Sequence, residues 1–585
     1  MSTLIDTRSP SLAVTEVMQL NGALNFGANV GTIRFFAGDY VPLGTVAADG
    51  SVLAVGGGSN LATLLSSSWG GDGTTTFGTP DADGRTLIGQ GTGNGLPTAT
   101  YGQAYGADGV ALTQANMPAG FGGSSQSFNH EQPSLATRYF INMEGDFPPR
   151  DGTADAKLSY IGMITAWAGG SSPPTDNGIW VECLGQSLSI FQYSALFSLL
   201  GTTFGGNGQT TFQLPNLSGR TIAGAGGLVQ QGQQDGYPFA TLTNAQLPTE
   251  MGGGGQSFYN LDPRLAMSYA IAVKGTVPST SANTVAVDIA MVGEIEAFAF
   301  NYAPEGWMLC QGQLLPIASY TDLFTQIGTL YGGDGVTTFA LPDLRGRELI
   351  GAGNGIAVGD VLGPDTNTLT LDDIPGLTYS GGAADDTLYG GNSGDTISGL
   401  DGNDMIQGWG GGDTLIGGNG NDALLGGLGN DTMTGGSGRD SLIGSAGKDI
   451  LVGGSDRDLL AGGKESDTMT GGLGADTFVF SRLRQGADRI LDWSRAEGDH
   501  LRIDASGFGS DVPAVTAAVA NMVIAAGAGA IASQASAQFI LRSDTGQLFY
   551  DDDGTGGHAA VLIVRLMLSG HVISTLSAGD FDIVA

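Results

Sequence analysis

A gapless series of eleven nine-residue units, running from Gly381 to Val479, is the feature that most limits how this chain can fold. Position one is Gly in every unit, position six is Asp in every unit, and position eight is always Leu, Ile, Met or Phe. Such a repeat predicts a solenoid, because each unit is a glycine-rich turn and a short strand that buries its apolar residue only against neighbouring units. The units are GGAADDTLY, GGNSGDTIS, GLDGNDMIQ, GWGGGDTLI, GGNGNDALL, GGLGNDTMT, GGSGRDSLI, GSAGKDILV, GGSDRDLLA, GGKESDTMT and GGLGADTFV.

The position-six aspartates are the candidate metal ligands. If two units make one coil, they form two columns: Asp386, Asp404, Asp422, Asp440, Asp458 and Asp476 along one edge, and Asp395, Asp413, Asp431, Asp449 and Asp467 along the other. Neighbouring coils lie about 4.8 Å apart, so the carboxylates of each column repel one another unless cations lie between them. Ca²⁺ takes about six to eight oxygen ligands, and Asp side chains with turn carbonyls supply them. The sequence therefore predicts several bound calcium ions.

Some units depart from the pattern and predict weaker sites within the same fold. The fourth-position glycine is replaced by Ala384, Ser393, Asp456 and Glu465, and the second-position glycine by Leu400, Trp409 and Ser445. We expect weak calcium binding at the turns of the first two units and near residues 456–465.

The unit pattern G-G-x-G-x-D-x-U-x resembles the RTX family of calcium-binding parallel β-rolls. The following segment, which contains GADTFVFSRLRQGADRILDWSRAEGDHLRID and ends in DFDIVA, resembles the cap and secretion region of RTX proteins. The resemblance implies export by a type I secretion machinery through an uncleaved C-terminal signal, and a secreted, extracellular or cell-surface location. It also implies a block that is unfolded at cytosolic calcium and folded outside the cell, since the binding free energy is folding free energy.

The first two thirds of the chain contain a threefold repeat. The motif aromatic-G-G-[DN]-G-x-T-T-F-x-x-P begins at Trp69, Phe204 and Tyr331, and each copy is followed by Gly-Arg. A second marker reads LTQANMP, LTNAQLP and LTLDDIP. We interpret the recurrent Gly-Arg as a structural turn rather than an anion site.

These signatures resemble the phage tail-collar domain, over about residues 30–120, 160–250 and 290–377. The resemblance implies β-rich domains. Because collar domains of fibres serve assembly and receptor contact, it also implies a structural role at a surface or in a matrix, or adhesion to a glycan or cell-surface ligand. A phage tail-fibre component is a further alternative, which the RTX block disfavours.

A third repeat, P-x-L-A followed by a β-rich segment, occurs at residues 10–22, 133–145 and 263–275 and predicts three strands. If each strand completes the domain before it, the first strand either closes the chain on itself or completes the third domain of another molecule. The second closure predicts self-association head to tail by strand addition. In a simpler alternative each strand belongs to the domain that follows it.

No catalytic constellation is found, and we expect no enzymatic activity. The only His-Glu pair, His130 and Glu131, has Ser134 where a zinc protease needs a second histidine. Cys183 and Cys310 occupy equivalent positions of two repeats and are expected to be buried thiols rather than a disulfide. The net charge of −35 argues against nucleic-acid binding. No apolar run is long enough to predict a membrane span.

The sequence thus predicts a mainly β protein with three tandem collar-like β domains, followed by a calcium-bound parallel β-roll and a small C-terminal cap. Its expected function is that of a secreted, calcium-dependent structural protein that self-associates. The expected segments are an N-terminal strand segment and possible donor strand (1–30), collar-like domain 1 (31–132), a strand plus collar-like domain 2 (133–262), a strand plus collar-like domain 3 (263–380), the RTX β-roll (381–479), and the cap and secretion signal (480–585).

Overall fold

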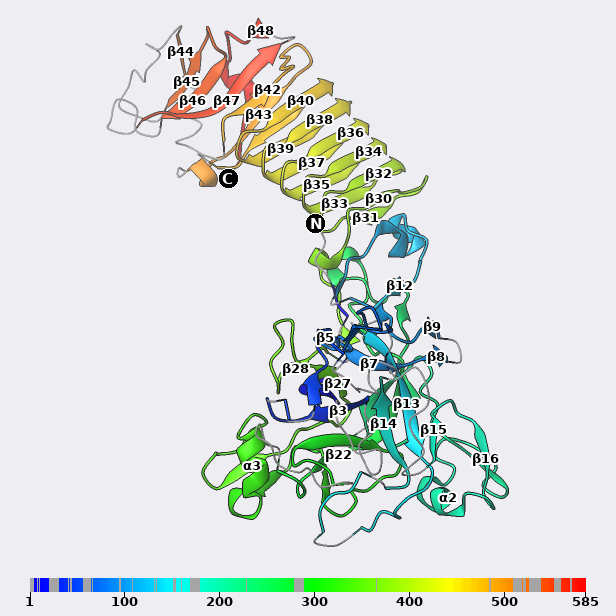
Figure 1. The fold of residues 1–585 in the computed structure, drawn as a ribbon. Helices are drawn as coiled ribbons and strands as arrows, with labels where there is room; N and C mark the ends of the chain where they lie inside the picture. Colours follow the sequence, from blue (N-terminus) through cyan, green and yellow to red (C-terminus); the bar gives the residue numbers. More distant parts are fainter. Residues whose placement is uncertain are drawn as a thin grey trace.

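The computed structural model shows a head, a β-roll and a C-terminal cap in series (Figure 1). It describes all residues except 1–4, 8, 10, 20–30, 40, 43–44, 56–64, 66, 94–95, 108, 131, 133, 151–153, 159, 169–178, 228, 278–288, 365, 483–485, 509–517, 519–521, 526–537, 552–558, 569–570 and 585. The architecture is mainly β, as the sequence predicts.

The three repeats of the head have the same order of strands, and the second and third also contain a described helix. The first contains β2 (Ser11–Gln19), β3 (Thr32–Phe36), β4 (Thr45–Ala47), β5 (Val52–Ala54), β6 (Thr76–Gly78) and β7 (Thr86–Gly89). The second contains β13 (Ser134–Asn142), β14 (Met163–Trp167), β15 (Trp180–Glu182), β16 (Ser187–Ser189), α2 (Ser194–Leu200), β17 (Thr211–Gln213) and β18 (Thr221–Gly224). The third contains β22 (Arg264–Ala272), β23 (Glu294–Phe298), β24 (Trp307–Leu309), β25 (Leu314–Pro316), α3 (Thr321–Ile327), β26 (Thr338–Ala340) and β27 (Glu348–Gly351).

The long strands β2, β13 and β22 are each shared between two repeats. The first half of β13 runs parallel to β7 of the repeat before it, and its second half runs antiparallel to β14 of its own repeat. β22 pairs with β18 and β23 in the same way. Each strand therefore belongs to both domains, rather than only to the one before or after it.

The N-terminal strand closes the head into a ring within one chain. β2 runs parallel to β27 of the third repeat, from Ser11 beside Glu348 to Val14 beside Gly351, and antiparallel to β3 of the first repeat. Of the two closures that the sequence leaves open, this structure has the one within a single chain, in which the edge of the third domain pairs with the chain's own first strand. The head is a pseudo-threefold assembly made by a single chain.

The Gly-Arg motifs join the repeats around the pseudo-threefold axis. The N–H of Gly89 donates to the carbonyl of Arg220 at 2.9 Å, that of Gly224 to Arg347 at 2.8 Å, and that of Gly351 to Arg85 at 3.0 Å. A Cβ on Gly224 would lie 2.0 Å from the Leu344 oxygen, so only glycine allows this approach. The motif is thus structural, as the sequence predicts.

The aromatic G-G-[DN]-G-x-T-T motif also has a structural role. Asp72 accepts the backbone N–H groups of Thr74, Thr75 and Thr76 at 2.7–2.9 Å and closes the turn. The indole N–H of Trp69 donates at 2.8 Å to the carbonyl of Ala168, in the next repeat. The motif therefore folds its own loop and contacts the neighbouring domain.

The two cysteines are buried and free, which confirms the prediction of unpaired thiols. Burial raises the pKa of the Cys183 thiol well above its usual range. Among the described residues, no helix is both long and apolar enough to cross a membrane.

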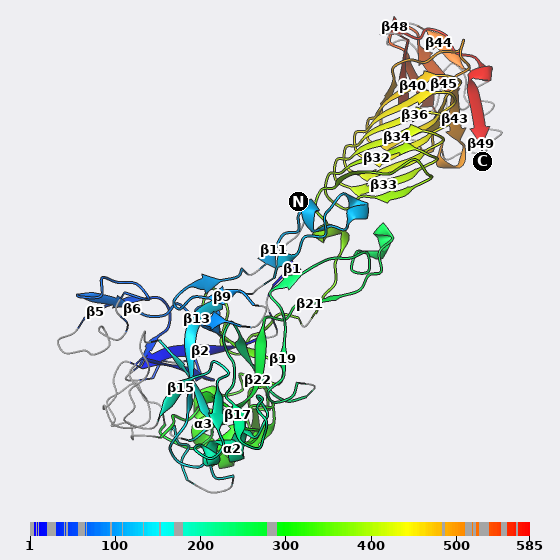
Figure 2. The same ribbon diagram turned by 90° about the vertical axis from the view of Figure 1, so that its right-hand side faces the viewer.

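A neck of three two-stranded ribbons joins the head to the β-roll (Figure 2). Its pairs are β1 (Ile5–Asp6) with β11 (Gly109–Val110), β12 (Phe128–Asn129) with β20 (Phe239–Ala240), and β21 (Phe258–Tyr259) with β29 (Thr366–Asn367). The following LT-x-x-x-x-P loops cover the first coil of the roll. There, the rings of Phe121 and Tyr379 are 5.8 Å apart. Leu112, Leu242 and Leu369 of the neck belong to the same apolar core as the roll.

The β-roll consists of two parallel sheets, each built from alternate units. One contains β30 (Thr378–Ser380), β32 (Thr396–Asp401), β34 (Thr414–Asn419), β36 (Thr432–Ser437), β38 (Ile450–Ser455) and β40 (Thr468–Leu473). The other contains β31 (Thr387–Tyr389), β33 (Met405–Gly410), β35 (Ala423–Leu428), β37 (Ser441–Ala446), β39 (Leu459–Lys464) and β41 (Thr477–Phe480). The register advances by two units per coil, as from Leu415 to Met433. Position-eight side chains such as these are fully buried between the sheets, and the predicted β-roll is confirmed.

The C-terminal cap continues both sheets. β42 (Asp488–Ile490) pairs with β40 and then with β47 (Val561–Leu568), while β43 (His500–Asp504) pairs with β41 and then with β49 (Phe581–Val584). The cap therefore covers the last coil with further strands.

Candidate metal centre

The position-six aspartates lie in two columns, as the sequence predicts. Each follows the glycine-rich turn of its unit and directly precedes a strand, so it lies at the edge of the sheet where the coil turns. The ten aspartates from Asp395 to Asp476 are 1–2% exposed, whereas Asp386 of the first unit is half-buried. Buried carboxylates in register are the starting point of the candidate site.

One oxygen of each carboxylate is held by the backbone. Oδ1 of Asp440 accepts the N–H of Asp422, one coil earlier, at 2.8 Å. Oδ1 of Asp422 accepts the N–H of Asp404 at 2.8 Å, and the contact recurs along both columns. These hydrogen bonds fix the direction of each carboxylate.

In most units, no described group donates a hydrogen bond to the second oxygen. This holds for the buried Oδ2 atoms of Asp404, Asp413, Asp422, Asp431, Asp440, Asp449, Asp458 and Asp467. A buried anionic oxygen without a donor is costly, and a metal cation is one of the few partners that offset this cost.

The position-one glycines show where such a cation fits. A Cβ added to Gly435 would lie 2.4 Å from Oδ2 of Asp440 and 2.5 Å from the carbonyl oxygen of Gly453, one coil further on. The backbone of Gly435 is not left-handed, so glycine is needed there for space rather than for conformation. The space beside it is bordered by a carboxylate oxygen and a carbonyl oxygen, which are the hard ligands that Ca²⁺ prefers.

The ligand set is one carboxylate oxygen per unit combined with backbone oxygens. Within the described residues, no cluster of three or more His, Cys, Asp or Glu side chains converges on one point. The residues present therefore suit calcium, which accepts carbonyl ligands.

Burial shifts the titration of the columns. Desolvation raises the pKa of Asp413 to about 8 and the pKa values of Asp449 and Asp458 to about 7. Neighbouring carboxylates of the same column add to each shift. The charged columns are thus unfavourable by themselves, and a bound cation favours the ionised form.

The first two units differ from the rest. Oδ2 of Asp386 accepts the N–H of Gly382 at 2.6 Å, and Oδ2 of Asp395 accepts the N–H of Gly391 at 2.8 Å. Their second oxygens are already hydrogen-bonded, which agrees with the weak binding expected from Ala384 and Ser393 in these two units. Near residues 456–465, where weak binding is also expected, the second oxygens of Asp458 and Asp467 have no donor among the described residues.

The cap contributes two aspartates that the nonapeptide pattern misses. Oδ1 of Asp488 accepts the N–H of Asp467, and Oδ1 of Asp499 accepts the N–H of Asp476, both at 3.1 Å. Both columns therefore extend beyond the last unit. The spacing grows from 18 to 21 and 23 residues here. Only the local pattern of Asp followed two residues later by an apolar residue, as in Asp488-Arg-Ile, signals them in the sequence.

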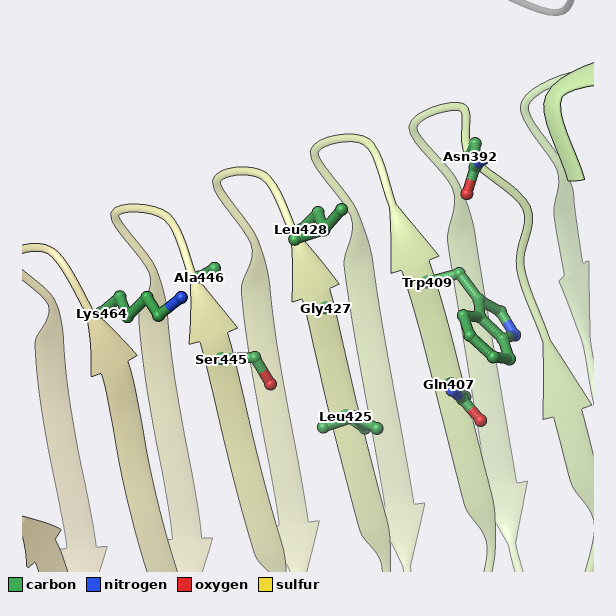
Figure 3. A pocket seen from close by; sticks show the side chains of 9 residues that line it. All are labelled: Asn392, Gln407, Trp409, Leu425, Gly427, Leu428, Ser445, Ala446 and Lys464. Carbon is green, nitrogen blue, oxygen red and sulfur yellow. The ribbon is translucent and has the colours of Figure 1, made fainter. Parts of the chain in front are cut away.

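A separate surface groove of about 470 Å³ crosses one sheet of the roll (Figure 3). It is lined by Asn392, Gln407, Trp409, Leu425, Gly427, Leu428, Ser445, Ala446 and Lys464. None of the column aspartates lines it. Trp409 replaces a second-position glycine and keeps the left-handed backbone of that position, with φ of 72°.

Comparison with known proteins identifies both parts of the chain. Residues 31–87, 162–222 and 293–349 match the Phage Tail Collar Domain. Residues 380–415, 408–442 and 443–478 match the RTX calcium-binding nonapeptide repeat. The chain therefore combines three phage tail collar domains with an RTX calcium-binding block, and both resemblances are confirmed.

No curated protein matches the chain. Among solved structures, the extracellular lipase LipA from Serratia marcescens is 14% identical with a TM-score of 0.14, and the match covers 46% of this chain and 49% of the lipase. The match thus spans about half the length of that lipase, and a likeness this weak carries no argument about activity.

Proposed function

We propose that the protein is a secreted structural protein of the cell surface or extracellular matrix, in which a calcium-folded β-roll carries a pseudo-threefold collar head. The observation that carries the proposal is the pair of buried aspartate columns, in which most second oxygens have no donor among the described residues, together with the apolar core that the roll shares with the neck. In this proposal the position-six aspartates and the glycine carbonyls hold the ions. The bound ions would screen repulsion between coils.

Calcium would then control the whole molecule rather than the roll alone. The neck loops rest on the first coil, where the Nε2 group of Gln114 donates to the carbonyl of Thr378. Loss of the roll removes this support from the head. The proposal includes export by a type I machinery, which passes the chain unfolded at low calcium and releases it into calcium-rich surroundings.

The test is a calcium titration of the full-length protein followed by circular dichroism and hydrogen exchange. We expect residues 396–473 to be exchange-protected only with calcium, and neck residues 109–129 to gain protection in the same calcium range. A roll that is equally protected in excess chelator would contradict the proposal. Secretion is tested separately, by deleting residues 480–585 in cells with a type I exporter.

A second candidate function, adhesion, rests on the end of the head farthest from the roll. The α2 and α3 lobes lie there (Figure 1), and Phe191 and Val336 are 97% and 81% exposed. Exposed apolar side chains on short, hydrogen-bonded turns suit contact with a glycan or cell-surface ligand. Binding of the protein to cells or glycan arrays that falls in Phe191→Ala and Val336→Thr would support this candidate, and unchanged binding would contradict it.

Self-association is also proposed, but not by strand addition, since β2 already pairs with β27. Analytical ultracentrifugation with and without calcium tests it, and a monomer at all calcium concentrations would exclude it.

We further propose that the protein has no catalytic activity.

A further inference from the structure

The outer face of one sheet of the roll carries the groove of about 470 Å³ shown in Figure 3. Residues of neighbouring coils stack along it, as Gln407 does beside Leu425 and Trp409 beside Gly427. The groove crosses β33, β35, β37 and β39, which span three coil spacings of about 4.8 Å, or roughly 14 Å in all. A depression of this volume and length suits an elongated small ligand.

The groove exists because the repeat departs from glycine at position two. On this sheet Trp409 and Ser445 replace that glycine and keep its left-handed backbone, with φ of 72° and 82°. Gly427 lies between them in the ladder and has no side chain, so it forms the floor between two walls. A bulky residue with positive φ is unfavourable, so the fold of the roll does not itself require a tryptophan here.

Trp409 and two leucines give the groove an apolar surface. The indole Nε1 is buried and has no hydrogen-bond partner among the described residues, so the ring rather than the N–H is what Trp409 offers to a ligand. Leu425 lies beside it, and Leu428 is 67% exposed. A flat aromatic ring beside exposed aliphatic groups suits the C–H face of a sugar ring.

Polar side chains line the same groove and are open to a ligand. The amide of Gln407 and the hydroxyl of Ser445 have no hydrogen-bond partner within the described part of the chain. Asn392 is already oriented, because its Nδ2 donates at 2.6 Å to Oδ1 of Asp372. Amides and hydroxyls both donate and accept hydrogen bonds, which matches the hydroxyl groups of a sugar.

The charge of the groove is opposite to that of its surroundings. Residues 381–479 contain 15 acidic and 4 basic residues, yet Lys464 is the only charged residue that lines the groove. Its side chain extends toward Ala446 (Figure 3) and forms no ion pair with any described residue. A lysine without an ion pair, in a groove without carboxylates, complements a ligand that carries a negative charge.

We propose that the groove binds an acidic oligosaccharide of the uronic-acid class. One sugar ring stacks on Trp409, a carboxylate pairs with Lys464, and the hydroxyls bond to Gln407 and Ser445. The site lies on the roll, so it is separate from the adhesion candidate at the far end of the head. An acidic peptide is the competing occupant, because it offers carboxylates to the lysine but no hydroxylated ring to the indole.

The test is calorimetric titration of the full-length protein in excess calcium. The probes are tetrasaccharides of galacturonate, glucuronate and mannuronate, the methyl ester of each, and a glutamate tetrapeptide. At least one acidic tetrasaccharide should bind, and its ester, which keeps the rings without the charge, should bind about 3-fold more weakly. No binding of any tetrasaccharide, or tighter binding of the peptide, would overturn the proposal.

Two variants with matched controls locate the binding. Trp409→Gly restores the repeat residue and should weaken binding about 10-fold, whereas Leu400→Gly, the same change on the opposite sheet at φ of 79°, should not. Lys464→Gln should abolish the preference for acid over ester, and Arg457→Gln, in the exposed turn before β39, should keep it. Circular dichroism in calcium checks that each variant folds. Unchanged affinity in Trp409→Gly, or a preference for acid that survives Lys464→Gln, would place the binding elsewhere and refute the site.

Discussion

Replacing Asp440 by Asn should change the stability of the roll with opposite signs in the absence and presence of calcium. The substitution keeps the shape of the side chain and the Oδ1 that accepts the N–H of Asp422 at 2.8 Å. It replaces only the Oδ2 that has no donor. The variant therefore isolates the charge and the metal-binding oxygen.

The magnitude follows from the burial of this carboxyl group. Desolvation raises the pKa of Asp440 from 3.8 to about 6, and a shift of one unit corresponds to about 1.4 kcal/mol. The side chain is only 2% exposed, but it lies near the protein surface, where screening by solvent reduces the full value of about 3 kcal/mol to about 1 kcal/mol. Without calcium, at pH 7.5, the variant should be more stable than wild type by about 1 kcal/mol, since no buried charge has to be maintained.

Calcium reverses the order. For a site with Kd of about 10⁻⁴ M, binding stabilises the fold by about 1.4 kcal/mol at 1 mM calcium and by about 2.7 kcal/mol at 10 mM. Loss of one such site leaves the variant less stable than wild type by about 1.7 kcal/mol at 10 mM calcium. The two stability curves should cross at about 0.4 mM calcium, where binding contributes about 1 kcal/mol.

The assay is urea unfolding of the full-length protein, with hydrogen exchange of residues 432–455 to localise the effect. Asp401→Asn is the matched control, because this exposed aspartate of the same block loses the same charge outside the columns. A variant that is less stable than wild type at calcium concentrations below the crossing, or that keeps the full calcium response, would refute the assignment of Oδ2 as a ligand.

Four further results are expected. Gly435→Ala should lose about 1.4 kcal/mol of the stabilisation by 1 mM calcium, because the added methyl group occupies the space beside Asp440. Gly412→Ala is the control and should keep this stabilisation, since the nearest atom to its added methyl group is 3.2 Å away. Equal calcium titrations of the two variants would contradict the prediction. The calcium midpoint measured by circular dichroism should rise as pH falls from 8 to 6. The folded-state pKa of Asp413 is raised to about 8, so the stability that its protonated form contributes without calcium is greatest below pH 4 and is lost as pH rises through 8. Protons therefore compete with calcium for this carboxylate at lower pH. A calcium midpoint that does not change with pH would contradict the prediction. Gly224→Ala should destabilise the head by about 3 kcal/mol, because its Cβ would lie 2.0 Å from a carbonyl oxygen, and Gly120→Ala, with nothing within 4 Å, should be neutral in the same thermal melt. Deleting residues 1–19 should expose the edges of β3 and β27 and cause concentration-dependent association in ultracentrifugation; a stable monomer would argue against the closing role of β2.

Much of the β-roll was predictable because its contacts repeat with the sequence. A period of nine residues and two units per coil places Asp422 beside Asp440, and the structure has that register. The continuation of the columns to Asp488 and Asp499 was not predicted, because the cap inserts residues between the strands and breaks the period.

The sequence alone determined the three collar repeats, the position-eight core of the roll and its two aspartate columns, since all of these follow from local spacing. Only the tertiary structure decided how the head closes, because the strand at residues 11–19 satisfies the same pairing rules with its own chain or with another. The partner of Ser11 is Glu348, more than 300 residues away, and no local pattern encodes a contact between such distant positions. The surface groove of the roll and the core shared by neck and roll likewise depend on residues brought together by folding.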